Sequence, residues 1–317
     1  MSQRIDVHQH IWSEPLIDAL AVRRELPFVR RENAQTVLHL AHERPWPIDT
    51  AAETPVRRAA LVSDDHIDRA LVSLSSPLGI EWLERGQSLE LIAAYHEGAI
   101  GLGDPFGVWG AVPLQAPDAA DVDRALELGC VGVSLPAGAL ASARALQRVG
   151  EILARLEARQ APLLVHPGPG SDLRAGGQPG QDSASDPPWW PALTSYVSSM
   201  QAAWLAFATA GHSRHPRLRV VFTMLGGLAP MQVERLAARG GPRSCARDSL
   251  LFYETSSHGP AAIEAVAQVV GHEQLLYGSD RPVLDPGPLG ALDRVDWGAI
   301  VEATSRALGG APVQVAA

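Results

Sequence analysis

The stretch APLLVHPG, residues 161–168, is a short apolar run that ends on a histidine and is followed by proline and glycine. Continuous apolar runs, rather than strict alternations of apolar and polar residues, are typical of parallel strands that are covered on both faces. The Pro-Gly pair marks a turn. The stretch therefore predicts a buried parallel strand with His166 at its carboxyl end.

Seven more β-type runs lie along the chain, most of them also continuous apolar segments, and helical patterns separate them. Strands that alternate with helices predict βαβ units, and eight such runs favour a closed (β/α)₈ TIM barrel over an open sheet. The other predicted strands are Arg4–His8, Ala70–Leu74, Val108–Pro113, Val131–Leu135, Arg219–Met224, Leu250–Thr255 and Leu275–Ser279.

The helical patterns carry recognisable start and stop residues. Asp118 begins one pattern that stops at Gly129, and Ser142 caps another that ends at Ala161-Pro162. Gly259-Pro260 precedes a third, which ends on glycine. Capping residues at the start and glycine at the end are the expected boundaries of helices.

We expect one barrel domain over residues 1–317, distorted by insertions after strands one and five. Residues 12–55 are rich in proline and arginine, and residues 167–190 are too polar and too rich in glycine and proline to pack. Long loops in compact domains are commonly functional or disordered. Loops that follow barrel strands surround the active site, so both insertions are expected to border it.

The composition excludes several classes of partner. The formal net charge is -9 at pH 7, and such a field repels nucleic acid. The N-terminus lacks the apolar region of a signal peptide, and no stretch reaches the ~18 apolar residues of a membrane span. Cys130 and Cys245 form no spaced framework, which suits a reducing compartment. We expect a cytoplasmic protein without membrane association, with Cys130 buried in its apolar run.

His8 and His10 flank Gln9 at the end of the first predicted strand. Side chains two residues apart on a strand point to the same side, so both imidazoles can face one point. Such a pair can chelate zinc or a similar divalent ion. The alternative is two incidental polar residues at a strand end. Other histidines, among them His96 and His215, lie in helical or loop contexts and are interpreted as surface residues.

His166 and Asp280 also end predicted strands, where a barrel places its reactive groups. Taken singly, His166 fits a hydrogen-bonded loop histidine, and Asp280 fits a helix cap or an ion pair with Arg281. Together with His8 and His10 they give three imidazoles and one carboxylate at the same end of the barrel. This convergence favours a mononuclear metal site.

The order HxH on strand one, His on strand five and Asp on strand eight resembles the amidohydrolase superfamily. The closer resemblance is to its amidohydrolase-related decarboxylase branch, typified by aminocarboxymuconate-semialdehyde decarboxylase, and it covers nearly the whole chain. The segments that carry it are IDVHQH, APLLVHPG, HPRLRVVFTMLGGLAPMQVERL, FYETSS and LLYGSDRP. The resemblance implies a barrel enzyme that binds one zinc ion through His8, His10, His166 and Asp280, and it favours a homodimer.

One departure from that branch concerns the end of strand six. The branch usually has His-Gly-Gly-Gly there, and its histidine orients or deprotonates the water held by the metal. This chain has Met224 instead, and a thioether carries no titratable proton. General acid–base assistance contributes typically ~10²–10⁴-fold, so the loss of this histidine would be severe unless another group replaces it. Asp280 and His258 are the candidate catalytic residues, with Glu254 near His258; an exposed loop position is the alternative for His258.

Two arginines and a tryptophan pair are candidates for substrate binding. Arg235 matches the place from which an arginine of the resembling decarboxylase enters the neighbouring subunit's pocket, and Arg44 corresponds loosely to a second such arginine. A guanidinium binds a carboxylate bidentately, although a surface position is the alternative for both. Trp189 and Trp190 either wall an aromatic-binding pocket or anchor the next helix in the core. Met224 is a further candidate pocket residue.

The sequence leaves three functions open. The first is metal-dependent, non-oxidative decarboxylation of a small unsaturated or aromatic carboxylic acid, with Asp280 or a water as proton donor. The second is hydrolysis of a lactone, ester or amide with Asp280 as base. Met224 weakens this hypothesis more than the first, because hydrolysis depends directly on activation of water. A biosynthetic cyclisation or rearrangement is also open. The third is a homologue that keeps the metal ligands but has lost turnover. The expected partner is a small-molecule carboxylic acid or a related substrate.

Overall fold

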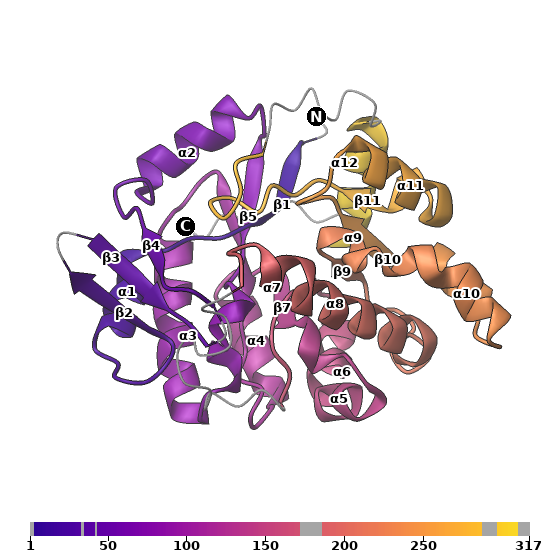
Figure 1. The fold of residues 1–317 in the computed structure, drawn as a ribbon, viewed down its shortest axis with the longest axis horizontal. Helices are drawn as coiled ribbons and strands as arrows, with labels where there is room; N and C mark the ends of the chain where they lie inside the picture. The colour runs from indigo at the N-terminus through magenta and orange to yellow at the C-terminus, as the bar shows by residue number, and fades with distance from the viewer. Residues whose placement is uncertain (1–2, 33–34, 42, 172–185, 287–296, 310–317) are drawn as a thin grey trace.

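Eight parallel strands form one sheet whose order follows the chain (Figure 1). The computed structural model describes residues 3–32, 35–41, 43–171, 186–286 and 297–309. The strands of this sheet are β1 (Ile5–Gln9), β5 (Arg69–Val72), β6 (Phe106–Gly110), β7 (Gly132–Pro136), β8 (Leu163–His166), β9 (Val220–Phe222), β10 (Leu251–Glu254) and β11 (Leu275–Leu276). Each one overlaps a run predicted from the sequence, so all eight strand predictions are confirmed.

The first and last strands of the sheet meet and nearly close it into a barrel. The amide of Val7 donates to the carbonyl of Tyr277 at 2.9 Å, and the amide of Asp280 donates to the carbonyl of His8 at 2.9 Å. The predicted distorted (β/α)₈ barrel is therefore confirmed. Its closure also bonds the turn that carries Asp280 directly to β1.

Large apolar side chains fill the interior of the barrel. They come from seven of the eight strands and are fully buried: Val7, Leu71, Trp109, Leu164, Val221, Phe252 and Leu276. Ala303 and Ala307 of α12 (Trp297–Leu308) pack against the same layer. Because the interior is a packed core, chemistry is left to the rim at the carboxyl ends of the strands. Cys130 is buried, as expected.

Helices surround the sheet (Figure 1). None of the helices described is long and apolar enough to cross a membrane. Besides α12 they are α1 (Glu14–Ala21), α2 (Pro55–Asp64), α3 (Arg85–Ile100), α4 (Ala119–Glu127), α5 (Ala143–Arg148), α6 (Gly150–Ala158), α7 (Trp190–Leu193), α8 (Ser195–Ala206), α9 (Met224–Gly227), α10 (Val233–Ala238) and α11 (Pro260–Val270).

The predicted helix boundaries agree with the structure, with one exception. The Asp118 side chain accepts from the amide of Ala120, and the Ser142 hydroxyl accepts from the amide of Ala145. The single helix expected after Ser142 is two helices, α5 and α6, with Val149 between them.

The first insertion contains an antiparallel sheet that the sequence analysis did not predict. Its strands are β2 (Phe28–Glu32), β3 (Gln35–His39) and β4 (Trp46–Ile48), at the left of Figure 1. Each strand buries one aliphatic side chain: Val29, Leu38 and Ile48. Of the second insertion, residues 172–185 lie outside the described residues, and the described part leads into α7.

Candidate metal centre

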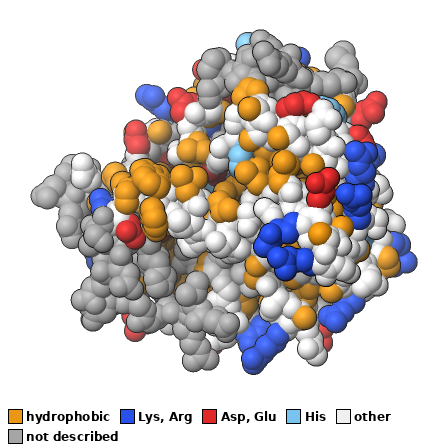
Figure 2. All heavy atoms as spheres, turned by 45° about the vertical axis from the view of Figure 1, so that its right-hand side comes forward, with side chains coloured by type: hydrophobic (Ala, Val, Ile, Leu, Met, Phe, Trp, Pro, Cys, Tyr) orange, Lys and Arg blue, Asp and Glu red, His pale blue; other side chains and the backbone are white. Residues whose placement is uncertain are grey.

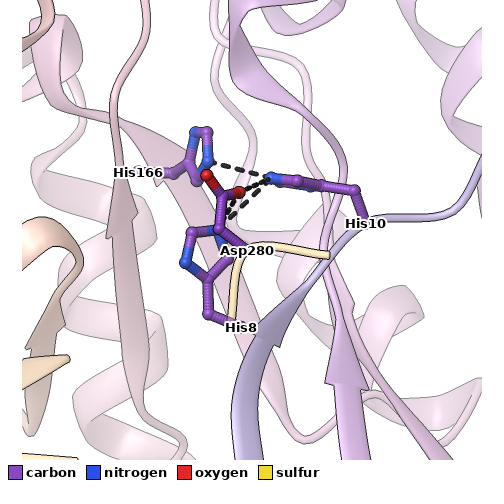
Figure 3. Close-up of side chains that lie close together, drawn as sticks. All are labelled: His8, His10, His166 and Asp280. Atoms are coloured by element: carbon purple, nitrogen blue, oxygen red, sulfur yellow. Dashed lines mark hydrogen bonds and ion pairs between the residues drawn. The ribbon is translucent and has the colours of Figure 1, made fainter. Parts of the chain in front are cut away.

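The four residues predicted as metal ligands meet at the carboxyl end of the barrel. His8 lies on β1 and His10 just beyond it, His166 ends β8, and Asp280 lies in the turn after β11. One ligand atom of each residue lies within 4.8 Å of the others. Figure 3 shows the three imidazole rings and the carboxylate converging from these elements.

The atoms that face one another are close. His10 Nε2 lies 3.3 Å from His8 Nε2 and 3.1 Å from His166 Nε2. Asp280 Oδ1 lies 3.1 Å from His10 Nε2 and 3.5 Å from His8 Nε2. The three histidines are buried, whereas the Asp280 side chain is 15% exposed. Asp280 is therefore the member of the cluster most accessible to solvent.

Hydrogen bonds at the outer nitrogens of His10 and His166 fix the protonation of their inner nitrogens. His10 Nδ1 donates to the carbonyl of Ser73 at 2.9 Å, and His166 Nδ1 donates to the carbonyl of Pro167 at 2.8 Å. Because a carbonyl only accepts, each Nδ1 carries the proton. In the neutral rings the two Nε2 atoms then present lone pairs to each other.

His8 completes this arrangement through a carboxylate. In the neutral ring its Nδ1 donates to Glu254 Oε2 at 3.1 Å, which leaves Nε2 with a lone pair as well. Three lone pairs and the Asp280 carboxylate around one point repel one another unless a cation lies between them. Imidazoles whose outer nitrogens bond to carboxylate or carbonyl groups are the usual ligands of protein-bound metals. The donor set therefore fits a divalent metal ion.

The charges near His8 favour a cation at the same point. Burial lowers the pKa of His8, but the hydrogen bond to Glu254 and the negative charges of Asp280, Glu254 and Asp6 outweigh it and raise that pKa to about 9. Burial and the neighbouring imidazoles lower the pKa of His166 well below its usual value. The acidic groups thus stabilise positive charge at the centre, whether a proton or a metal ion carries it.

Asp6, which the sequence analysis did not single out, joins β1 to the turn that carries Asp280. Its Oδ1 accepts from the amides of His8 at 3.0 Å and Ser279 at 3.1 Å. The carboxyl group is buried, and burial raises its pKa to about 6 against the hydrogen bonds that lower it. One carboxylate therefore positions the backbone next to two candidate ligands.

A buried chain of hydrogen bonds continues from Asp6 to α2. Gln9 Nε2 donates to Asp6 Oδ2 at 2.8 Å, and Arg58 donates to Gln9 Oε1 at 2.8 Å. Arg58 pairs with Glu53 at 3.2 Å, and both side chains are buried. Glu53 also accepts from the amide of Trp12 at 3.0 Å. These contacts fix the end of β1 against the first insertion.

The turn after β9 carries Met224 and is left-handed. The φ angles are 52° at Met224, 52° at Leu225, 64° at Gly226, 61° at Gly227 and 61° at Leu228. For each residue other than glycine, this conformation costs roughly 1–2 kcal/mol of conformational energy relative to the right-handed one. Strained backbone persists where its surroundings determine it, and it clusters at functional sites. This turn is therefore a strained part of the rim, as are Ser257 and Asp280, whose φ angles are 65° and 60°.

Glu254 links the left-handed turn to His8. Its Oε2 accepts from the amide of Met224 at 3.3 Å and from the hydroxyl of Ser256 at 2.8 Å, besides His8 Nδ1. A Cβ at Gly278 would lie 2.2 Å from Glu254 Oε1, so glycine there leaves room for the carboxylate. With these donors around it, Glu254 fits a group that orients His8 rather than a free general base.

The other predicted catalytic and anionic-substrate residues lie outside this cluster. His258 is half-buried beyond β10, and its Nδ1 donates to the carbonyl of Ser256 at 2.9 Å. Arg235 is exposed on α10, and Arg44 is exposed in the first insertion, where it donates to the carbonyl of Asp186 at 2.5 Å. The roles predicted for His258, Arg235 and Arg44 stay predictions.

The two tryptophans lie at the surface. Trp189 is 54% exposed and Trp190 is 44% exposed, so neither anchors the core, and the pocket-wall alternative stays a prediction. Hydrophobic side chains are frequent on the face that Figure 2 presents.

The surface interpretation was wrong for His96 and His215, which are buried. His96 Nε2 accepts from the amide of Ala111, and burial lowers its pKa to about 4.

Comparison with known proteins supports the family resemblance that the sequence motifs indicated. The profile of the family described as Amidohydrolase matches residues 5–305, which confirms the resemblance. The solved 5-carboxyvanillate decarboxylase LigW from Sphingomonas paucimobilis is 17% identical, with 98% of this chain and 99% of that chain covered and a TM-score of 0.71.

Two further similar structures are also decarboxylases. The 5-carboxyvanillate decarboxylase from Novosphingobium aromaticivorans DSM 12444, with manganese and 4-hydroxy-3-methoxy-5-nitrobenzoic acid, is 16% identical; 97% of this chain and 96% of that chain are covered, with a TM-score of 0.71. The 2,6-dihydroxybenzoate decarboxylase from Rhizobium is 15% identical; 98% and 99% are covered, with a TM-score of 0.68. These likenesses establish the fold.

Proposed function

The chain belongs to the amidohydrolase family, and from this premise we propose that it is a metal-dependent, non-oxidative decarboxylase of a small aromatic or unsaturated carboxylic acid. Family membership makes it a metal-dependent enzyme of the lyase or hydrolase type. The observation that carries the choice of reaction is a combination of two residues. A carboxyl group, Asp280, borders the donor set on its solvent side, while Met224 occupies the place of the usual base.

We assign His8, His10, His166 and Asp280 as the ligands of one divalent ion, with zinc as the proposed metal. Three imidazoles and a carboxylate are donors that zinc accepts. When bound, the ion supplies Lewis acidity toward the substrate's oxygens and the negative charge that develops on the substrate. Because a similar decarboxylase structure contains manganese, the identity of the metal is part of the test.

Asp280 is the proposed proton donor. In the reaction the bond between the substrate carbon and its carboxylate breaks, carbon dioxide leaves, and the electron pair stays on the carbon. That carbon takes the proton of the Asp280 carboxyl group, which regains a proton from solvent. Oδ1 of Asp280 faces His8 and His10, so Oδ2 is the oxygen that can carry the proton. Exposure of this side chain allows the exchange with solvent.

Met224 separates decarboxylation from hydrolysis. Hydrolysis depends on a group that takes a proton from water, and a thioether has no such capacity. Decarboxylation depends instead on a proton donor, which Asp280 supplies without help from the turn after β9. His258 remains a second candidate for proton transfer, since it lies beyond β10 at the same rim.

The substrate class rests on the family and on the three similar structures, whose names give decarboxylases of aromatic acids. An aromatic acid needs an apolar wall and a partner for its carboxylate. We propose Trp189 and Met224 for the wall and Arg44 for the carboxylate. Arg235 would serve only from a second copy of the chain, in the proposed homodimer.

The proposal is tested with metal-loaded protein and a panel of hydroxybenzoic and dienoic acids. We expect release of carbon dioxide from at least one of them, loss of this activity after chelation, and recovery on adding back the ion found by elemental analysis. A parallel panel of lactones, esters and amides serves as the control. Faster turnover of that panel would favour a hydrolase, and fully metal-loaded protein inert toward both would favour a homologue without turnover.

A further inference from the structure

We propose that the barrel binds a small oxyanion, carried by a phosphate or carboxylate group, at the end opposite the metal centre. A depression of about 460 Å³ lies there. A volume in this range suits a small molecule. The residues that line it are Arg219, Ser249, Leu250, Phe252, Ser305, Arg306 and Gly309.

The place of this depression in the fold separates it from the metal centre. Arg219 directly precedes β9 and Leu250 directly precedes β10, so the depression lies at the amino ends of these strands. Ser305 and Arg306 come from the last turn of α12. In a barrel of parallel strands all amino ends lie on the side away from the active-site rim. None of the lining residues is a candidate metal ligand.

Within the described part of the chain, neither guanidinium of the depression pairs with a carboxylate. Arg219 donates to the carbonyl of Gln160, and Arg306 donates to the carbonyl of Glu273. Other arginines do pair with carboxylates: Arg31, Arg58, Arg85, Arg155 and Arg281. In a chain with a net charge of -9, two guanidiniums that share a depression without an acid point to a counter-charge from a ligand.

Arg219 also holds a buried donor that lacks a partner. Its Nε is shielded from solvent and makes no hydrogen bond to any described residue. Burial lowers the pKa of this guanidinium, since the charge is partly removed from water. Guanidinium groups bind planar or tetrahedral oxyanions through two parallel hydrogen bonds. An oxyanion in the depression would neutralise this partly buried charge by binding the Arg219 guanidinium.

The walls fit a ligand that has a small apolar part beside its anionic group. The guanidinium carbon of Arg306 lies 5.5 Å from the centre of the Phe252 ring, and Leu250, two residues before Phe252, lines the same depression. A Cβ at Gly309 would lie 2.8 Å from a terminal nitrogen of Arg219. Glycine at this position therefore leaves room for the Arg219 guanidinium.

An anion bridging the two arginines would join α12 to β9. Ala303 and Ala307 of α12 already pack against the interior layer of the barrel. Binding should therefore stabilise the closed barrel, while catalysis at the other end keeps its substrate affinity. The expected signature is a higher unfolding temperature with an unchanged KM.

The test titrates inorganic phosphate into the full metal-loaded chain, with potassium chloride at equal ionic strength as the reference. We expect the unfolding midpoint to rise by roughly 3–6 °C at phosphate well above its dissociation constant. Arg219→Gln and Arg306→Gln should each abolish most of this rise. Arg217→Gln is the matched control, because Arg217 is an exposed neighbour outside the lining residues. Phosphate that binds at the metal would act on all variants alike, so the difference between variants isolates the proposed site.

Arg306 is exposed, so its replacement should leave folding intact even if Arg219→Gln does not fold. A phosphate effect in Arg306→Gln equal to that of the wild type would overturn the proposal. So would an equal rise with chloride. Isothermal titration of the wild type and Arg306→Gln then checks that the stabilisation reflects stoichiometric binding.

Discussion

Two sides of the metal centre differ in how firmly the chain fixes them. On the side of β1 and β11, the outer nitrogen of His10 is hydrogen-bonded, and Asp6 holds the backbone beside both His8 and Asp280. On the side of β9, a strained left-handed turn presents Met224, which has no titratable group. The chain therefore holds the backbone beside two of the proposed ligands firmly, whereas the turn after β9 supplies no acid or base through Met224. That difference suits a reaction that needs a bound ion and a proton donor but no activated water.

The largest effect is expected from His10→Ala, which removes a proposed metal ligand on the side of β1 and β11. His10 Nε2 lies closest to the other donors, so its loss leaves two imidazoles and a carboxylate. We expect metal affinity to fall by more than ~100-fold, beyond what the loss of an outer partner causes. Elemental analysis after dialysis and competition with a chelator measure this. His258→Ala is the control and should keep its metal; a His10→Ala protein with a full metal complement would show that the cluster is not a metal site.

Arg58→Met tests the buried chain that supports β1. Removing one member of a buried ion pair typically costs about 3–5 kcal/mol, because the remaining charge stays buried without a partner. Glu53 would be that charge. Urea unfolding should show that the free energy of unfolding falls by this amount. The double variant Arg58→Met, Glu53→Gln should recover part of that free energy. Arg57→Met, at the exposed neighbouring position, is the matched control, and an equal loss there would argue against a role for the pair.

Glu254→Ala connects the two sides, since Glu254 bonds to both His8 and the amide of Met224. Loss of a carboxylate behind a metal-binding imidazole typically lowers metal affinity by about 10–100-fold. Chelator competition should show a decrease in this range for Glu254→Ala. Glu254→Gln keeps an acceptor for His8 Nδ1 and should show a smaller decrease. Equal decreases in both variants would mean that charge, rather than orientation, is what Glu254 contributes.

The parts of the molecule that sequence alone predicted share a physical cause. Most of the barrel strands are continuous apolar runs because both of their faces are covered, and the donor residues stand out because each lies at or just beyond the end of a predicted strand. β2, β3 and β4 were missed because each lies among prolines and arginines and buries a single aliphatic side chain. Local composition does not reveal strands of that kind.

Other features depend on contacts that no local pattern records. Gln9 bonds to Arg58, 49 positions along the chain, so the support of β1 has no sequence signature. The left-handed turn contains only two glycines among five residues, and its other members would ordinarily avoid that conformation. His96 was misplaced for a similar reason, since its acceptor role toward Ala111 is what allows a histidine to be buried.

Met224→His tests the side of β9, where the chain supplies no titratable group at Met224. Among these substitutions, its effect on decarboxylation should be the smallest. Histidine tolerates positive φ better than most residues, so the turn should still form. If Asp280 supplies the proton, restoring an imidazole should change the rate of carbon dioxide release by no more than about tenfold. Met231→His, at an exposed methionine beyond the same turn, is the control. A large gain in ester or lactone hydrolysis confined to Met224→His would instead favour a hydrolase that has lost its usual base over the proposed decarboxylase.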